Sequence, residues 1–428
     1  MKTMRRWLAG FAYSSLLVLL MPAYLLRLWW RGRVEPLYRT ALGERLGHHR
    51  GAASAGCVWI HAVSLGETRA ASALVDALRA LRPGMRLLLT HSTATGREAG
   101  RALLRDGDVQ TWLPFDTPGA VHRFLRHFQP AVGVLMETEV WPNLLRVAQE
   151  QALPMVLANA RLSERSLRRG LRFDALIRPA VESLAAVLAQ TEADAQRLRQ
   201  AGARVVSVVG NLKYDLAPDA TQLARGRAWR DALPRQVVLV ASSREGEEGP
   251  LLACWAALPQ PRPLLLLVPR HPQRFDAVEA LVREAGLSLA RRSAWADAPP
   301  LEAAQADVWL GDSMGEMAMY YACAHVALLG GSFAPLGGQN LIEAAACGCP
   351  VVMGPHTFNF AQAAELALAE GAALRVADSE AGVAKAVSLL SDAAAREAAV
   401  AYSLVFAARH RGAAARMAAQ IDAVAPPG

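Results

Sequence analysis

A single carboxylate near the start of the chain has the placement of a general base. The stretch "HAVSLGETRAA" (61–71) follows four apolar residues, and within it Ser64 and Glu67 have the Ser-x-x-Glu spacing. In that spacing the two side chains cap the first turn of a helix. A carboxylate there also sits at the carboxyl end of the preceding strand, where open α/β sheets bind ligands, and the helix dipole favours its ionised form. The residues alone leave both roles open for Glu67, a helix cap and a general base.

Three polar corners in the second half of the chain could bind a phosphate. Arg270 and His271 end an apolar run, and the planar guanidinium suits a phosphate or a carboxylate. Gly337 and Gly338 precede an expected helix whose first N–H groups favour an anion, and Glu343 could accept the hydroxyls of a ribose. Each corner alone also fits an ordinary turn or cap, but together they favour a nucleotide pocket. The corners are "VPRHPQRF" (268–275), "GDSMGE" (311–316) and "GGQNLIEAAACG" (337–348).

Other charged residues of the first half also follow apolar runs. The string "METEVWPN" holds Glu137 and Glu139, and "GNLKYD" holds Lys213. We expect the turn before Pro142 to separate the two carboxylates, so that they do not flank a glycosidic bond as a pair.

The string "NARLSERSLRRG" carries four arginines. Arg161 and Arg165 are four residues apart and would share one face of an expected helix. That face could bind lipid phosphates, or it could be ordinary solvated surface.

Short apolar runs alternate with longer helical patterns behind the N-terminal segment. This alternation predicts an α/β fold of doubly wound parallel sheets. The rhythm restarts after a less regular region, which predicts two such domains facing a cleft. Strands are expected in the stretches 57–64, 86–92, 109–115, 131–138, 154–161, 186–191, 204–215, 236–248, 263–275, 307–316, 326–333 and 349–360. The predicted organisation is an anchor at 1–30, a linker at 31–55, domains at 56–215 and 236–428, and an interdomain linker at 216–235.

Length and composition fit a globular chain of more than one domain. The 428 residues are 53% hydrophobic and 20% charged. The net charge of +8 suggests acidic partners. The sequence carries no motif of a nucleic-acid module, so that we expect an anionic membrane surface or phosphorylated lipid instead. The five cysteines are an odd number without a disulfide pattern and follow no zinc spacing, which fits a reducing compartment.

The N-terminal segment has the features of a single membrane anchor. Trp7 to Leu26 contains no charged residue, and its 20 residues would span roughly 30 Å as a helix. Arginines and tryptophans flank it on both sides, as at a membrane interface. The charge counts leave the orientation undecided. A cleaved signal peptide is the alternative, but no small-x-small cleavage site follows.

The ordered set of motifs resembles the 3-deoxy-D-manno-octulosonic acid (Kdo) transferases of Gram-negative lipopolysaccharide synthesis. The resemblance extends from about residue 36 to 365. It is carried by "VSLGE", "LPFDTP", "METEVWPN", "NARLSERS", "GNLKYD", "PRHPQRF", "GDSMGE" and "MGPHTFNF", in this order behind an N-terminal anchor.

The resemblance implies a GT-B glycosyltransferase with two Rossmann-like domains. The acceptor would be lipid IVA, bound by the N-terminal domain, and the donor would be CMP-Kdo, bound mostly by the C-terminal domain. No metal or other cofactor is expected. The enzyme would be anchored in the inner membrane by one pass, with its catalytic domains on the cytoplasmic side.

The resemblance also assigns roles to residues of this sequence. Glu67 matches the general base, which favours that role over the cap alone, and Glu137 and Lys213 match transition-state stabilisers. The positions that match contacts to CMP are Arg270, His271, Met314, Gly315, Glu316, Asn340, Leu341, Ile342 and Glu343. One departure stands out, because Gln339 occupies the place of the family's usual histidine and cannot carry a charge.

The chemistry of the residues agrees with this assignment. CMP is a good leaving group, so that the protein must orient two substrates, deprotonate a hydroxyl and stabilise the departing phosphate. A single base without a second carboxylate partner fits one displacement with inversion. Two alternatives stay open: a GT-B transferase that uses a UDP-sugar, and a lipid A-binding homologue without catalysis, for which Gln339 is the only hint.

Overall fold

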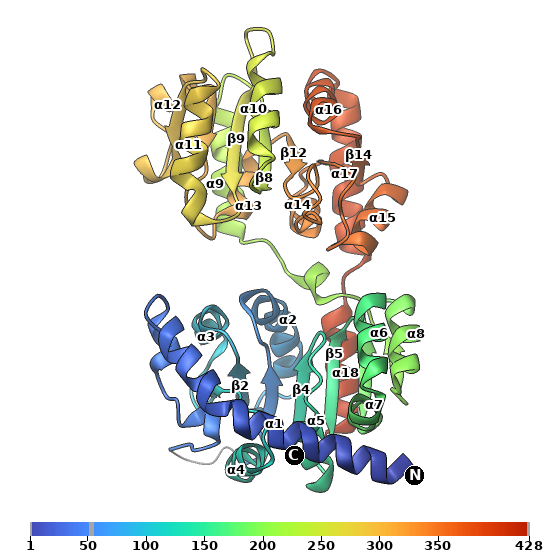
Figure 1. Cartoon of the computed structure of the whole chain (residues 1–428). Coiled ribbons are helices and arrows are strands. Elements are labelled where there is room, and N and C mark those ends of the chain that lie inside the picture. Colours follow the sequence, from blue (N-terminus) through green and yellow to red (C-terminus); the bar gives the residue numbers. More distant parts are fainter. Residues whose placement is uncertain (1, 51–54, 426–428) are drawn as a thin grey trace. The chain divides into compact units, whose positions relative to one another are not determined.

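The computed structural model describes residues 2–50 and 55–425 and divides the chain into two compact units. Unit 1 comprises Met1–Asp215 together with Arg411–Gly428, and unit 2 comprises Leu216–His410. Each unit is built around a seven-stranded sheet in which every pair of neighbouring strands is parallel. Figure 1 shows both units coloured along the chain.

The sheet of unit 1 has the strand order β3-β2-β1-β4-β5-β6-β7. Its strands are β1 (Val58–His61), β2 (Leu87–His91), β3 (Val109–Trp112), β4 (Val132–Met136), β5 (Met155–Ala160), β6 (Ala186–Ala189) and β7 (Val206–Val208). Its helices are α1 (Lys2–Arg31), α2 (Leu65–Leu81), α3 (Ala94–Gly100), α4 (Pro118–Phe128), α5 (Pro142–Glu150), α6 (Glu164–Arg172), α7 (Asp174–Glu182), α8 (Glu192–Ala201) and α18 (Ala413–Val424).

Helices cover both faces of this sheet, which explains why its strands read as continuous apolar runs. Neighbouring residues of β1 belong to different cores: Ile60 packs with α2 and α18, and Trp59 packs with α4 and α5. Both side chains are fully buried. The sheet therefore holds the start of each following helix at a fixed place along its carboxyl edge.

The sheet of unit 2 has the strand order β10-β11-β9-β8-β12-β13-β14. Its strands are β8 (Val237–Ser243), β9 (Leu264–Pro269), β10 (Leu289–Arg291), β11 (Val308–Leu310), β12 (Val326–Leu329), β13 (Val351–Met353) and β14 (Ala373–Arg375). Its helices are α9 (Ala220–Ala232), α10 (Glu248–Ala256), α11 (Phe275–Glu284), α12 (Leu301–Gln305), α13 (Met317–Cys323), α14 (Leu341–Ala346), α15 (Ala361–Ala369), α16 (Ser379–Ser391) and α17 (Ala393–Arg409).

All twelve expected strands are present, and β10 and β14 were missed. Both missed strands lie at sheet edges, and each has only one large apolar residue, Leu289 in β10 and Leu374 in β14, so that no apolar run marks it.

Three predicted segment boundaries were wrong. The C-terminal domain does not extend to residue 428, because α18 packs on α2 in unit 1. The Asp215 carboxylate accepts the backbone N–H groups of Gly412 and Ala414 and thereby caps this helix from a distant part of the chain.

The interdomain linker 216–235 contains α9, which packs on α13, because Gly226 lets the two backbones approach closely. The linker 31–55 buries Tyr38 and Arg45 against unit 1.

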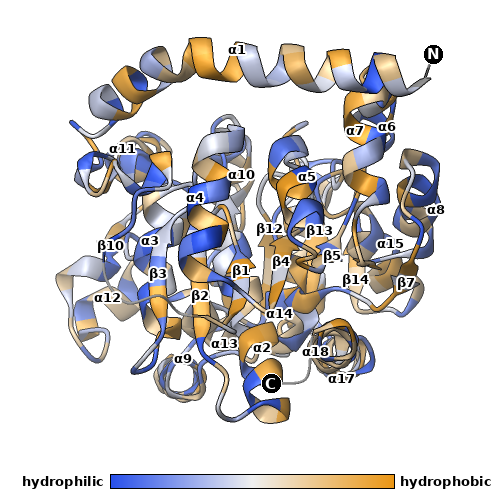
Figure 2. Cartoon of the chain, turned by 90° about the horizontal axis from the view of Figure 1, so that it is seen from below, coloured by the Kyte–Doolittle hydropathy of each residue, from blue (hydrophilic) through white to orange (hydrophobic). Residues whose placement is uncertain are grey.

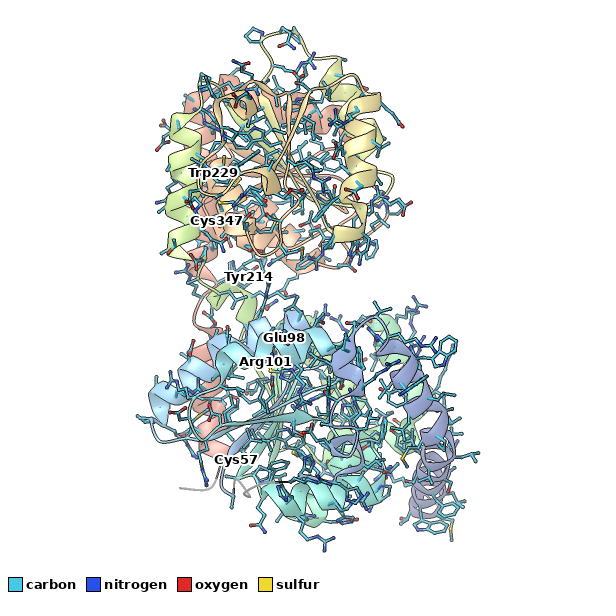
Figure 3. All side chains as sticks on the ribbon, turned by 90° about the vertical axis from the view of Figure 1, so that its left-hand side faces the viewer. Cys57, Glu98, Arg101, Tyr214, Trp229 and Cys347 are labelled. Carbon is cyan, nitrogen blue, oxygen red and sulfur yellow. The ribbon has the colours of Figure 1, made fainter. Side chains whose placement is uncertain are left out.

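Within the described part of the chain the cysteines form no disulfide bond, and most of them are buried. Figure 3 shows Cys57 in unit 1 and Cys347 in unit 2 among the side chains that fill the two units. Burial raises the pKa of the Cys347 thiol to about 12, which keeps it protonated. These cysteines therefore pack as small apolar residues.

One helix is long and apolar enough to cross a membrane by length and composition. It covers Thr3–Arg31 within α1, with a mean hydropathy of 1.7 in its most apolar window.

Candidate active site

The topological switch point of unit 1 lies between β1 and β4. The chain builds β2 and β3 on one side of β1 and then crosses to β4 on the other side. Glu67 lies in the first turn of the helix after β1, and Glu137 follows β4 directly. Because ligands of open α/β sheets bind outside the strand ends at such a switch point, both carboxylates occupy the expected position of a site.

Glu67 caps the start of α2, as the Ser-x-x-Glu spacing predicted. Ser64 is the N-cap residue, and its hydroxyl oxygen accepts the Glu67 N–H at 3.4 Å. The Glu67 carboxylate accepts the Val63 N–H at 2.7 Å and the Ser64 hydroxyl at 3.1 Å. These bonds fix the carboxylate at the carboxyl edge of the sheet while leaving it partly exposed. The cap and a catalytic role are therefore compatible in one residue.

The protonation state of Glu67 suits proton transfer near neutral pH. Burial raises the pKa of its carboxyl to about 7, and the negative charges of Glu137 and Glu139 act in the same direction. The hydrogen bonds from Val63 and Ser64 oppose this shift but do not cancel it. A base works best when its pKa lies close to the working pH. This carboxylate can therefore accept a proton from a bound hydroxyl.

Glu137 is held in a constrained geometry. It is buried and has a φ of 59°, the left-handed region that a side chain with a Cβ rarely adopts. Its carboxylate accepts a hydrogen bond from Arg161 Nε at 2.9 Å, and Arg161 Nη2 lies at 2.9 Å from the same oxygen. The backbone strain and this ion pair together fix the Glu137 carboxylate beside the switch point.

The prediction that Arg161 shares a helical face with Arg165 was wrong. Ser163 caps α6, so that Arg161 lies in the loop between β5 and that helix, where Glu137 binds it. Arg165 is exposed on α6 itself. The two arginines are separated because the helix begins only at Glu164. Ser163 is its N-cap residue, and the Ser163 hydroxyl oxygen accepts the N–H of Ser166.

Lys213 joins the carboxylates at this edge. Burial lowers the pKa of its ammonium group, while the charges of Glu137 and Glu67 raise it and Arg161 lowers it. The three predicted residues of unit 1 therefore influence one another electrostatically. Glu139 was expected to be separated from Glu137 by the turn before Pro142, but the two carboxylates interact. Burial raises the pKa of the Glu139 carboxyl, and the negative charge of Glu137 raises it further.

The corresponding edge of unit 2 carries cations. Arg270 and His271 follow β9 directly and are exposed. Burial lowers the pKa of His271, and the positive charges of Arg244, Arg270 and Arg274 lower it further. A neutral imidazole beside three guanidinium groups can bind an anion without supplying the charge itself.

The second predicted corner of unit 2 precedes α13. Met314 and Gly315 lie exposed in the loop after β11, and Glu316 is the N-cap residue of the helix. The Glu316 carboxylate accepts a hydrogen bond from Arg292 Nη2 at 2.8 Å and contacts the Ser313 hydroxyl. The loop is thus held by its carboxylate, while Met314 and Gly315 stay exposed.

The third corner is the start of α14. Asn340 is its N-cap residue and accepts the Ile342 N–H at 3.2 Å, as the capping interpretation expected. Leu341 and Ile342 are buried, so that only their backbone groups could contact a ligand. Burial raises the pKa of Tyr321, with Glu343 acting in the same direction and Arg270 in the opposite one. Glu343 and Arg270, from two predicted corners, therefore both lie close enough to act on one phenol.

A buried carboxylate that sequence reasoning did not single out shapes this edge. Glu247 accepts the N–H groups of Gly331 at 2.6 Å and of Phe333 at 3.0 Å. It thereby joins the loop after β8 to the glycine-rich loop after β12. A Cβ on Gly330 would lie 2.3 Å from the Ser242 carbonyl oxygen, so that only glycine allows this approach. The sequence feature that could have identified Glu247 is the Glu-Glu pair in "SSREGEE", which lies at the end of an expected strand.

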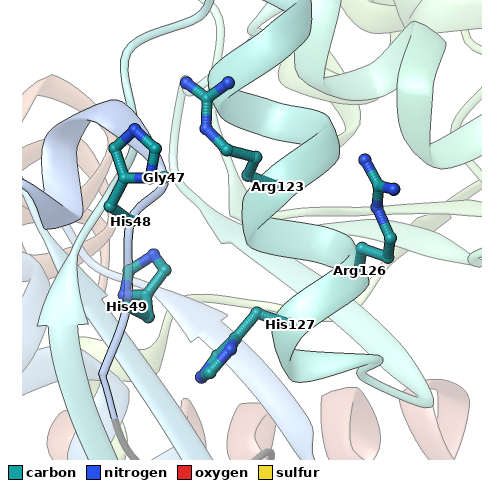
Figure 4. Close-up of a pocket in the computed structure, with 6 residues that line it drawn as sticks. All are labelled: Gly47, His48, His49, Arg123, Arg126 and His127. Atoms are coloured by element: carbon teal, nitrogen blue, oxygen red, sulfur yellow. The ribbon is translucent and has the colours of Figure 1, made fainter.

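A separate basic pocket of about 320 Å³ lies away from these edges. Figure 4 shows its lining side chains between the segment after Gly47 and α4. Arg126 and His127 lie in the last turn of α4, just before β4 begins. The pocket therefore faces the edge where strands start, opposite to Glu67.

Comparison with known proteins decides the family. Residues 40–216 match the family described as 3-deoxy-D-manno-octulosonic-acid transferase (kdotransferase). The 3-deoxy-D-manno-octulosonic acid transferase of Bordetella pertussis is 48% identical over 418 residues, which cover 94% of this chain and 96% of that protein. This chain belongs to the Kdo transferase family. The Kdo transferase of Haemophilus influenzae is 36% identical and covers 82% of this chain and 83% of its own length.

The solved structure of a glycosyltransferase from Rickettsia africae shares the fold of this Kdo transferase. It has a TM-score of 0.59 and 12% sequence identity, and the match covers 87% of this chain and all of that one. Together with the two parallel sheets, this likeness confirms the predicted GT-B fold. The chain is a glycosyltransferase of the Kdo transferase family.

Proposed function

We propose that this Kdo transferase moves Kdo from CMP-Kdo to lipid IVA at the cytoplasmic face of the inner membrane. The observation that carries the proposal is the Glu67 carboxyl, whose pKa of about 7 coincides with its place at the switch point of unit 1. A base of this kind is what transfer to a sugar hydroxyl requires.

In the proposed reaction, Glu67 takes the proton of the acceptor hydroxyl. The freed oxygen electron pair forms a bond to the anomeric carbon of Kdo, and the bond from that carbon to the CMP phosphate breaks with its electrons going to the phosphate. Attack opposite the leaving group inverts the anomeric configuration. The proposal gives Glu67 the role of the base and assigns no carboxylate to a covalent intermediate, so that the transfer is a single displacement.

The other residues of the two edges have supporting roles in this proposal. In this proposal Glu137 and Lys213 stabilise the charge that develops on the sugar, and Arg161 and Arg165 bind acceptor phosphates. In unit 2, Arg270 and His271 bind the CMP phosphate. The accessible backbone of Met314 to Glu316 and the first turn from Asn340 to Glu343 bind the nucleoside.

The proposed transfer uses no resident cofactor. Among residues 2–50 and 55–425, no group of three or more His, Cys, Asp or Glu side chains is arranged to hold a metal ion. If the transfer needs no metal, as this proposal holds, its rate is the same with and without EDTA.

The test is incubation of the purified full-length protein with lipid IVA and freshly prepared CMP-Kdo, followed by mass spectrometry of the lipid. We expect a product heavier by one or more Kdo units. An unchanged acceptor, with folded protein and intact donor, would overturn the proposal. Turnover with a UDP-sugar in a parallel reaction would then identify the other GT-B activity, and binding of lipid IVA without turnover would point to Gln339 and a binding protein.

A further inference from the structure

Helix α1 lies against the rest of unit 1 along most of its length. The Tyr13 hydroxyl donates to Asp116 Oδ2 at 2.8 Å, and the Ser14 hydroxyl donates to Asn143 Oδ1 at 3.0 Å. The ring of Tyr24 meets that of Phe115 edge-on at 4.6 Å between centroids, and Leu28 is buried. Figures 1 and 2 show α1 running across unit 1, past the end of α7.

The polar contacts of α1 are built into the domain. Asp116 is buried, and its carboxylate also accepts the backbone N–H groups of Asn143 at 3.1 Å and Leu144 at 2.7 Å. Asn143 Nδ2 donates to the Asp116 carbonyl at 2.6 Å. The hydroxyls of Tyr13 and Ser14 thus dock on the pair that holds the first turn of α5.

Docking over this length is incompatible with crossing a membrane. Contacts with unit 1 run from Arg6, which pairs with Glu182 at 3.5 Å, to Leu28. The 22 steps from Arg6 to Leu28 correspond to roughly 33 Å of helix, about the whole thickness of a hydrocarbon core. If α1 spanned the bilayer, every one of these partners would have to enter it.

The faces of α1 that point away from unit 1 are apolar. The charged side chains lie only toward the ends, where Arg6, Arg27 and Arg31 flank the apolar stretch. The exposed large apolar side chains of α1 are Met4, Trp7, Leu8, Phe11, Leu16, Val18, Leu19, Leu20, Tyr24, Leu26, Trp29 and Trp30. Figure 2 shows the apolar colouring along the helix.

A lipid leaflet is the occupant that this surface favours. Aromatic rings and cations at the ends of an apolar helix match the interface of an anionic membrane. A second copy of the chain would instead bring the same arginines against each other.

The docked helix lies at the edge of unit 1 that carries the general base. Asp116 follows β3, Asn143 is in the first turn after β4, and Ala94, which packs with Leu28, is the first helical residue after β2. These residues share the carboxyl edge of the sheet with Glu67. A leaflet in contact with α1 would therefore present lipid headgroups beside that edge.

We propose that α1 is an in-plane membrane helix, docked on unit 1 through Asp116 and Asn143, with its other faces in the leaflet that holds the acceptor. This inference rests on the membrane attachment in the proposed function and replaces the single-pass arrangement expected from the sequence. It places the N-terminus on the same side of the membrane as the two units.

The first test compares two single cysteines in the full-length protein in inner-membrane vesicles. Thr3→Cys lies at the exposed start of α1, and Ala394→Cys is exposed on α17 as a reference in unit 2. We expect a membrane-impermeant maleimide to label both introduced cysteines from the same face of the membrane. The unchanged chain serves as the control, because it shows how much label its own cysteines take up. Labelling of Thr3→Cys from the opposite face, or from neither, would overturn the inference.

The second test measures docking directly. In membranes, a short bifunctional thiol reagent should bridge Ser14→Cys to Asn143→Cys. The matched pair Ser15→Cys with Asn143→Cys shares one substitution but points Ser15 away from the domain, and we expect at least tenfold less bridging. Equal bridging of the two pairs, or none in either, would contradict docking.

The two proposals can fail separately. Product formation from lipid IVA is read by mass spectrometry and does not depend on where α1 lies. If the chain is released from membranes by a high-salt wash but still forms product, the transferase proposal stands and the in-plane helix is wrong.

Discussion

At the central edge of unit 1 three carboxylates gather beside Lys213 and Arg161, whereas the edge of unit 2 exposes Arg270 and His271 after β9. The same kind of parallel sheet supplies both edges, so that the difference lies in the residues after the strands. Mutual repulsion among carboxylates raises the pKa of Glu67 beyond the effect of burial. Repulsion among cations lowers that of His271. One edge is therefore prepared to accept a proton, and the other to bind an anion.

The strongest challenge to this division is Glu67→Gln. Loss of a general base typically costs about 10²- to 10⁴-fold in rate, and we expect kcat to fall within that range while the affinity for CMP stays unchanged. Calorimetric titration with CMP and a transfer assay measure the two quantities. Ser64→Ala is the control, because it weakens the cap but keeps the base. Near-normal turnover of Glu67→Gln would return this residue to the role of a cap.

Arg270→Ala tests the opposite edge. Removal of a charged partner of a phosphate costs roughly 1.5–3 kcal/mol, so that we expect about 10- to 100-fold weaker binding of CMP. The pH dependence of kcat should not move, because the base is in the other unit. Arg283→Ala removes an exposed arginine paired with Glu279 and serves as the matched control. Equal losses in both variants would show that only net charge matters.

The pH profile sharpens the comparison further. Glu67 must be ionised to act, so that kcat should rise with pH and level off above about 7, with roughly a tenfold loss per pH unit below it. Glu137→Gln removes a negative charge that raises the pKa of Glu67, which should move the midpoint to lower pH. Initial rates at saturating substrates between pH 5 and 9 measure this, in a series held at constant ionic strength. A midpoint that stays in place would mean that Glu137 does not act on the base.

The smallest expected effect concerns the contact between α1 and unit 1. Tyr13→Phe leaves the buried Asp116 carboxylate without one of its donors, and we expect the free energy of unfolding in detergent to fall by about 1 kcal/mol. Tyr24→Phe keeps the ring that packs on Phe115 and is the control. Chemical denaturation compares the variants. If the two substitutions have the same effect, the bond to Asp116 contributes nothing specific.

Local spacing explains why much of the fold could be predicted. Buried parallel strands appear as short apolar runs, which located every strand except the edge strands β10 and β14. The Ser64 to Glu67 spacing and Asn340 before a helix correctly predicted caps, since these interactions join residues within one helical turn.

Pairings between distant residues required the tertiary structure. The sequence by itself determined the strands, the caps and the apolar character of α1. Only the fold decided that α18 returns to unit 1, that Arg161 binds Glu137, and that α1 docks on Asp116. The physical reason is that spacing along a chain records contacts within a few residues, whereas these partners are brought together by packed sheets. The raised pKa of Glu67 belongs to the same class, because burial and neighbouring charges from other strands produce it.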